Sequence, residues 1–243
     1  MVAVDADETR LSLPVMNKHH CILLIAVGCL LAASCGATVA RAPATPTPIT
    51  TPVVDLTKSA VQVVANGCKR VEVHGAGLMV AHGRIATVAH VVAGARSIQV
   101  RGVHGSAEAT IVYFDPVLDL AVLKVDPAFA SPIEIGPAAK GDQGSVVVYR
   151  NDLPVELPAG VQRPVNIRTA DIYGDGTHIR PGYELNLDIH AGDSGAVVVV
   201  HNKAVALVWA TSRQSKARAW AMQASLLTDH LSGDTAVDHG KCA

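Results

Sequence analysis

The segment Gly192-Asp193-Ser194-Gly195 lies between two apolar runs of the sequence, and it is the stretch that decides the fold. Its glycines allow a tight turn that presents a serine hydroxyl and inward-facing backbone amides. A serine by itself is a poor nucleophile, because it needs a base within hydrogen-bond reach and a further group that holds the tautomer of that base. We therefore expect a histidine and a buried carboxylate elsewhere in the chain.

Two segments upstream of the serine supply these groups. His90 stands in the run TVAHVV at residues 87–92, which follows the glycine-containing run GAGLMV at residues 75–80. Asp119 stands in the run FDPVLDLAVL at residues 114–123, where it leads an apolar strand. The order along the chain is histidine, aspartate, serine, which differs from the order in subtilisin and in α/β-hydrolases. We predict that His90 is the general base, Asp119 its orienting carboxylate and Ser194 the nucleophile.

Each of these residues also has a purely structural interpretation. Ser194 could be an ordinary β-turn serine, and His90 could be a core histidine that hydrogen-bonds to the backbone. Asp115 competes with Asp119 for the third role, but an aspartate that precedes a proline, here Pro116, favours the start of a turn. Asp119 is therefore the preferred carboxylate.

Together the three segments resemble the histidine, aspartate and serine regions of trypsin-like and HtrA-like serine proteases, and the resemblance covers roughly residues 59–231. Within these families, the chain also resembles the protease domain of actinobacterial acid-resistance membrane serine proteases, because Cys68 precedes the histidine region and Cys242 lies near the end. The resemblance implies a chymotrypsin-like double β-barrel, hydrolysis of peptide bonds, and an oxyanion hole made by the backbone amides of Gly192 and Ser194. Residues 196–197 are Ala-Val where the family usually has Gly-Pro, which removes no catalytic group.

The pattern of apolar residues by itself predicts an all-β fold. Between about Lys58 and Leu231, short Val, Ile and Leu runs alternate with Gly, Pro, Asn and Asp at roughly ten-residue spacing, which is typical of a sandwich or a barrel. Residues 223–231 form the one clear helical pattern. Examples of the predicted strands are Val61–Ala65, Gly77–Ala81, Ile98–Arg101, Ala109–Phe114, Leu120–Val125, Ser145–Tyr149, Ala196–Val200 and Ala204–Trp209.

Substrate specificity is predicted from the resemblance. Asp188, six residues before Ser194, falls where trypsin-like enzymes place the acid that selects arginine or lysine. Residues 183–189 alternate like a strand, and on that alternative interpretation Asp188 would face solvent. The other predicted substrate-binding residues are His190 and Ala191 at the pocket entrance and Val208, Trp209 and Ala210 on a strand that would pair with the substrate backbone.

The N-terminal part has the layout of an export signal. The apolar run at residues 21–33 follows Lys18 and precedes small residues, and it is short for a membrane span. Residues 31–36 (LAASCG) resemble a lipobox, which predicts lipidation of Cys35; cleavage after Ala40 and a retained anchor are the alternatives. Met16 is an alternative start, because an acidic stretch precedes it.

These features divide the chain into three parts. Residues 1–40 are a signal peptide, lipoprotein signal or membrane anchor, residues 41–57 are a Pro-, Thr- and Ala-rich linker, and residues 58–243 are the protease domain. Cys68 and Cys242 remain after removal of the signal, and an even pair in an exported protein predicts a disulfide.

Composition excludes several classes of function. The formal net charge of -1 gives no electrostatic reason to bind nucleic acid. The sequence has no His-Glu-x-x-His or paired Cys-x-x-Cys spacing, so we expect neither a metal nor a cofactor. The sequence therefore predicts a secreted, envelope-tethered and monomeric serine endopeptidase that acts on proteins or peptides. The alternative is a catalytically silent binding module of the cell envelope on a protease fold.

Overall fold

The computed structural model describes residues 55–212 and 215–243, together with the backbone of residues 5–6. Apart from those two residues, the predicted signal or anchor at 1–40, with Cys35, lies outside the described part, and so does the predicted linker up to residue 54. In the described part, no helix has the length and apolar character needed to cross a membrane.

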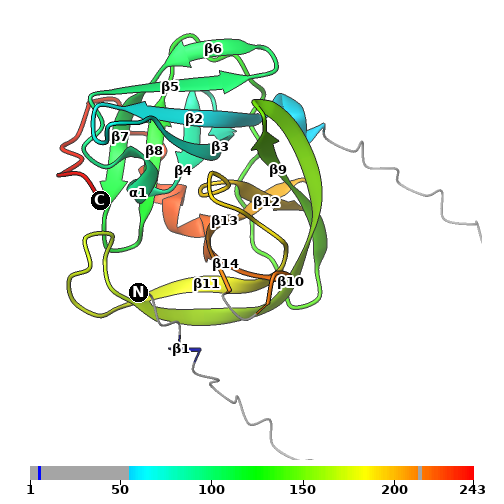
Figure 1. The fold of residues 1–243 in the computed structure, drawn as a ribbon. Helices are drawn as coiled ribbons and strands as arrows, with labels where there is room; N and C mark the ends of the chain where they lie inside the picture. The colour runs from blue at the N-terminus through cyan, green and yellow to red at the C-terminus, as the bar shows by residue number, and fades with distance from the viewer. Residues whose placement is uncertain (1–4, 7–54, 213–214) are drawn as a thin grey trace, which may run out of the picture. The chain divides into compact units, whose positions relative to one another are not determined.

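The first of two antiparallel sheets carries the N-terminal half of the described chain (Figure 1). A 3₁₀ helix at Leu56–Lys58 precedes this sheet, and the short helix α1 (Ala89–Val92) follows β4 (Arg84–Thr87). Its strands are β2 (Ala60–Asn66), β3 (Val73–Ala81), β4 (Arg84–Thr87), β5 (Ser97–Gly102), β6 (Gly105–Glu108), β7 (Thr110–Asp115) and β8 (Leu120–Lys124). They lie in the order β6-β5-β2-β3-β4-β8-β7.

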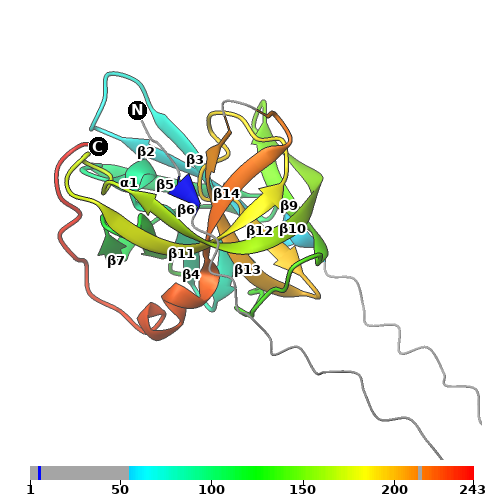
Figure 2. The ribbon, with the colours of Figure 1, turned by 90° about the horizontal axis from the view of Figure 1, so that it is seen from below.

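The second sheet carries the C-terminal half. Its strands are β1 (Asp5–Ala6), β9 (Gln143–Arg150), β10 (Leu153–Thr169), β11 (His178–Asn186), β12 (Val197–Val200), β13 (Lys203–Thr211) and β14 (Arg218–Gln223). The order is β1-β10-β11-β14-β13-β12-β9, and β9 also pairs with β10, so β9 to β14 close into a barrel. Figure 2 shows the long curved hairpin of β10 and β11 from below.

Small aliphatic side chains fill the interior of both sheets. All four valines of β12 are buried, and so are the first six residues of β2, because these strands have neighbours on both faces. One cluster of buried residues fills the first sheet and continues beneath the 3₁₀ helix at Ala224–His230, and a second fills the second sheet. A core of this kind agrees with an aromatic content of only 3%.

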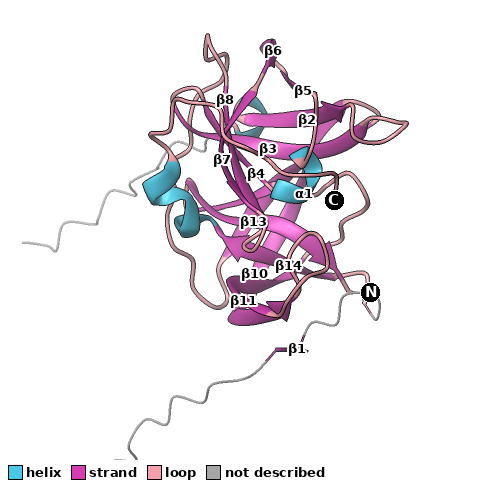
Figure 3. Cartoon of the chain, turned by 90° about the vertical axis from the view of Figure 1, so that its left-hand side faces the viewer, coloured by secondary structure: helices cyan, strands magenta, loops and turns pink. Residues whose placement is uncertain are grey.

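The predicted fold class is confirmed. Strands dominate the described chain and helices are few and short (Figure 3). Each of the eight predicted strands overlaps a strand of the structure, and the helix predicted at residues 223–231 is the 3₁₀ helix at Ala224–His230. The two curled sheets form the predicted double-barrel architecture.

Candidate active site

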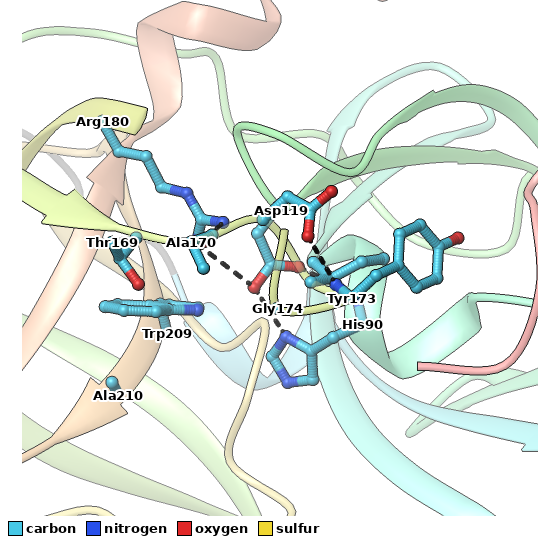
Figure 4. A pocket seen from close by; sticks show the side chains of 11 residues that line it. His90, Asp119, Thr169, Ala170, Tyr173, Gly174, Arg180, Trp209 and Ala210 are labelled. Atoms are coloured by element: carbon cyan, nitrogen blue, oxygen red, sulfur yellow. Dashed lines mark hydrogen bonds and ion pairs between the residues drawn. The ribbon is translucent and has the colours of Figure 1, made fainter. Parts of the chain in front are cut away.

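His90 and Asp119 are in direct contact (Figure 4). His90 lies on α1, and its backbone N–H donates to Asp119 Oδ1 at 2.8 Å while its ring Nδ1 lies 2.7 Å from Asp119 Oδ2. The Asp119 side chain is only 1% exposed, whereas that of His90 is 29% exposed. With Nδ1–H donating to the carboxylate, Nε2 carries the lone pair and can accept a proton. This is the geometry of an oriented general base.

Asp115, the alternative carboxylate, has a different partner set. Its Oδ1 accepts the backbone amides of Val117 and Leu118, both at 2.8 Å, and so closes the turn between β7 and β8. Asp119 ends that turn in a left-handed conformation with φ of 58°, which is uncommon outside glycine. Asp115 therefore shapes the turn from which the Asp119 carboxylate reaches His90.

The turn that carries Ser194 packs against the first sheet. The carbonyl oxygen of Ser194 accepts the amide of Ala76 on β3 at 2.8 Å. A Cβ added to Gly75 would lie 2.8 Å from Val91 Cγ1 and 3.0 Å from the Ser194 carbonyl oxygen, so the serine turn and α1 meet at the same point of β3. Gly195 has φ of 86° and its Cα faces the Ala76 carbonyl so closely that a side chain would not fit.

Among the described residues, no hydrogen bond joins the His90 ring to the Ser194 hydroxyl. Such a contact commonly tightens only when substrate is bound. The structure therefore brings His90 and Asp119 together, and it places the half-buried Ser194 against β3, the strand that packs on the helix of His90.

The two amides predicted for the oxyanion hole are free to bind. The Asp193 amide donates to the His190 carbonyl at 3.1 Å, and Gly192 has φ of 97°, which together define a type II turn. Within the described residues, neither the Gly192 amide nor the Ser194 amide donates a hydrogen bond. Both are therefore available to a developing negative charge on a substrate carbonyl.

Arg150, at the end of β9, holds this turn and was not predicted from the sequence. Its guanidinium forms a bidentate pair with the carboxylate of Asp193, with NH2 at 2.7 Å from Oδ2 and NH1 in contact with Oδ1. The same carboxylate, which is completely buried, accepts the amide of His190 at 2.7 Å. The hydrogen bonds to Asp193 raise the pKa of Arg150, and the charge of Asp188 adds to this more weakly.

Arg180 is a second arginine that the sequence did not single out. It lies on β11 and is 1% exposed, and its NH1 is 3.8 Å from Asp119 Oδ2. Dashed lines in Figure 4 join the Asp119 carboxylate both to His90 and to Arg180. Burial lowers the pKa of Arg180, and the charge of Asp119 is the largest of the opposing effects. A guanidinium nevertheless stays protonated in proteins.

A cavity of about 620 Å³ opens beside His90 and Asp119. Trp209 and Ala210, two of the predicted substrate-binding residues, line it together with residues 169–174. Trp209 lies at an irregularity in the pairing of β13 with β14. The neighbouring Val208 is buried, and both its amide and its carbonyl are hydrogen-bonded within the protein.

The remaining predicted specificity residues are on the surface. Asp188, His190 and Ala191 are exposed, and Asp188 lines a separate hollow of about 210 Å³ with Gln143 and Gly160. His190 Nδ1 lies 3.1 Å from Arg150 NH2. The structure thus gives Asp188 a nearby cation in Arg150 and does not place it in the cavity beside His90. In the described part, no group of three or more potential ligand side chains could hold a metal ion.

The C-terminal tail is fastened next to the helix of His90. Cys242 forms a disulfide with Cys68, 174 residues away in the sequence. The backbone carbonyl of His239 accepts the amide of Gly94 at 3.1 Å. The ring Nε2 of His239 lies 2.9 Å from the carbonyl oxygen of Ala95. The tail therefore supports the segment that directly follows α1.

Removal of this disulfide should lower stability. In the chain-entropy model, opening a loop of this length by replacing both cysteines with serine lowers the free energy of unfolding by about 4 to 5 kcal/mol. Urea denaturation of the oxidised wild type and of the double variant measures the difference. The reduced wild type is the matched control and should unfold at the same urea concentration as the variant. Equal midpoints for the oxidised and reduced wild type would contradict the prediction.

Comparison with known protein families identifies the class to which this fold and site belong. Residues 75–207, more than half of the chain, match the family described as the trypsin-like peptidase domain. The chain belongs to this family of trypsin-like peptidase domains. The resemblance inferred from the three sequence segments is thereby confirmed.

Individual relatives come from Mycobacterium tuberculosis. Serine protease Rv3671c of strain H37Rv and serine protease MT3772 of strain CDC 1551 are each 32% identical to this chain over 161 residues, which is 63% of this chain and 40% of the relative. The chain thus spans about two fifths of the length of these curated relatives. The crystal structure of the active form of the Rv3671c protease matches with a TM-score of 0.72 at 25% identity, covering 77% of this chain and 86% of that chain.

More distant structures share the fold. The inactive form of the Rv3671c protease matches with a TM-score of 0.63 at 25% identity, covering 73% of this chain and 89% of that chain. The HtrA-type protease AlgW with a tripeptide matches with a TM-score of 0.60 at 20% identity, covering 71% and 58% of the two chains. At that identity the similarity to AlgW supports the architecture alone.

Proposed function

We propose that this chain is an exported, envelope-tethered serine endopeptidase in which Ser194, His90 and Asp119 form the catalytic triad. The observation that carries the proposal is the contact of the buried Asp119 carboxylate with His90 Nδ1 at 2.7 Å. The turn of Ser194 packs against β3, which also contacts α1, the helix of His90. A higher TM-score to the active form of the Rv3671c protease than to its inactive form supports an active arrangement.

In this mechanism His90 Nε2 takes the proton of the Ser194 hydroxyl, and the serine oxygen attacks the substrate carbonyl carbon. Asp119 holds the imidazole in the tautomer that accepts this proton and stabilises the imidazolium that forms. The amides of Gly192 and Ser194 donate to the carbonyl oxygen as it becomes negative. His90 then returns the proton to the leaving amine, and a water molecule repeats the sequence on the acyl-enzyme.

The alternative is a catalytically silent module on the same fold. Such a module would need a collapsed oxyanion turn, in which the Gly192 amide is turned away or satisfied by the protein. The type II turn at residues 190–193 favours the active enzyme, and so do the amides of Gly192 and Ser194, which donate no hydrogen bond to any residue that the structure describes.

A fluorophosphonate probe tests the proposal, because it phosphonylates only an activated serine. The purified full-length chain should be labelled on Ser194, and Ser194→Ala should abolish the labelling. Ser212→Ala is the matched control and should be labelled as the wild type is. A folded wild type that resists the probe would count against the endopeptidase.

Membrane fractionation tests the lipid tether. When the chain is expressed in a bacterium, the labelled protein should be found in the membrane fraction, and replacement of Cys35 should release it. Release of the protein into the medium whether or not Cys35 is present would contradict the lipid tether.

A further inference from the structure

The proposed triad is divided between the two sheets. His90 follows β4, and Asp119 precedes β8, so both belong to the first sheet. Ser194 precedes β12 and belongs to the second sheet. Catalysis requires reacting groups to keep their separation within fractions of an ångström, so the two sheets need a fixed link close to the site.

Arg180 forms such a link. From β11 of the second sheet, its Nε donates to the carbonyl oxygen of Val117 at 2.6 Å, across to the turn of the first sheet that carries Asp119. Its NH2 donates to the carbonyl oxygen of Ala170 at 2.9 Å, in the loop that lines the cavity. The guanidinium thus connects the turn that contains Val117 with the loop that contains Ala170. It also lies 5.1 Å from the centre of the Trp209 ring.

The third nitrogen of Arg180 faces Asp119. NH1 is shielded from solvent and, within the described residues, has no hydrogen-bond partner, while Asp119 Oδ2 lies 3.8 Å away. A substrate group in the cavity cannot reach a nitrogen that solvent does not reach. The cation therefore acts on the Asp119 carboxylate. Among the residues that the structure describes, the only hydrogen-bond donors to this buried carboxylate are the two nitrogens of His90.

Loss of one partner of a buried ion pair leaves the other charge uncompensated, which is costly. Without Arg180, the Asp119 carboxylate would lose its compensating cation and the carbonyl of Val117 would lose its donor. Both changes favour movement of the turn at residues 115–119 toward water, away from His90.

We propose that Arg180 is a positioning residue of the protease: it clamps the turn that carries Asp119 onto the second sheet and, through Asp119, keeps His90 aligned with Ser194. This inference rests on the proposed function of the triad. Arg180 lines the cavity, but its NH1, the nitrogen that faces Asp119, is shielded from solvent, so its effect on the triad passes through Asp119.

A double-mutant cycle on the full-length chain tests the proposal, with the fluorophosphonate labelling rate constant as the readout. Arg180→Met, which keeps the length and removes the charge and the fork, should slow labelling about 100-fold. Arg180→Lys, which restores the charge without the fork, should recover part of this loss. In the Asp119→Asn background, Arg180→Met should change the rate less than about threefold, because the group through which it acts is already lost.

Matched controls separate the outcomes. Arg163→Met removes a partly exposed arginine of β10 that pairs with Glu184, and Glu184 keeps a second cation in Arg218. Its labelling rate should therefore stay within about twofold of the wild type. A labelling rate within about twofold of the wild type for a folded Arg180→Met variant would overturn the inference. An equal further loss in the Asp119→Asn background would overturn it too, because the two residues would then act independently.

If Arg180→Met does not fold, the same cycle with Arg180→Lys decides between these outcomes. Failure of the proposed function is distinguishable from failure of this inference. In the first case the wild type is not labelled at all. In the second the wild type is labelled and the arginine variants equal it.

Discussion

Asp119→Asn should lower kcat for peptide hydrolysis about 10⁴-fold while leaving the fold intact. The carboxylate now accepts both the backbone amide and the ring Nδ1 of His90. An asparagine can place its amide group toward Nδ1, which then must accept, and the proton of the imidazole moves to Nε2. A protonated Nε2 cannot take the proton of Ser194. Steady-state hydrolysis of a fluorogenic peptide library, with circular dichroism to confirm folding, measures the loss.

Asp115→Asn is the matched control for this prediction. Asp115 Oδ1 accepts the amides of Val117 and Leu118, and an asparagine oxygen can accept the same two bonds. Its kcat should therefore stay within a few fold of the wild type. If the two variants lost activity equally, or if Asp115→Asn were the more damaging, the assignment of Asp119 as the orienting carboxylate would be wrong.

The three residues predicted from the sequence as the triad each have a recognisable local sequence context. His90, Asp119 and Ser194 each stand in a local run whose neighbours are constrained, such as the glycines that flank Ser194 and the turn formed by Asp115. Constraints of this kind are visible in a single sequence because turns and short strands are local. The fold class followed from the same local signals repeated along the chain.

Arg150 and Arg180 carry no such signal. Arg150 pairs with Asp193 over a sequence separation of 43, and Arg180 binds the carbonyl of Val117 over a separation of 63. An arginine in an alternating strand is usually a solvent-exposed residue. The packing of the two sheets buries the guanidinium of Arg180, whereas Arg150 stays 33% exposed and pairs with a turn of its own sheet. No motif spacing links them to the catalytic residues.

The longest strand was also missed, for a local reason. β10 contains Pro154, Pro158 and Pro164, and proline within a run argues against a strand because it donates no ladder hydrogen bond. Pro158 lies opposite Ser145 of β9 and Pro164 lies opposite Tyr183 of β11. β10 pairs with β9 along its first half and with β11 along its second half, and β1 pairs with its other edge only at Ile167 and Arg168. The positions of the three prolines therefore each have one edge without a strand partner among the described residues.

Arg150→Met should lower kcat by about 10²- to 10³-fold, which is the loss typical of removing one oxyanion donor. The Asp193 carboxylate is completely buried, and Arg150 supplies its only charged partner among the described residues. A buried carboxylate without its cation is strongly destabilised, so Asp193 should turn toward water. Because Asp193 is bonded on either side to Gly192 and Ser194, that movement rotates the amides that stabilise the oxyanion. Peptide hydrolysis and the fluorophosphonate labelling rate should therefore fall together.

The charge on Asp193 is the cause in this argument, and a second substitution isolates it. In the Arg150→Met background, Asp193→Asn removes the uncompensated charge while its side-chain oxygen can still accept the amide of His190. Activity should recover by about tenfold or more, because burial of a neutral amide costs less free energy than burial of an unpaired carboxylate. Arg150→Lys should fall between the wild type and Arg150→Met, since lysine keeps the charge and loses the bidentate geometry. A double variant no more active than Arg150→Met would mean that Arg150 supports the site by packing and not by neutralising Asp193.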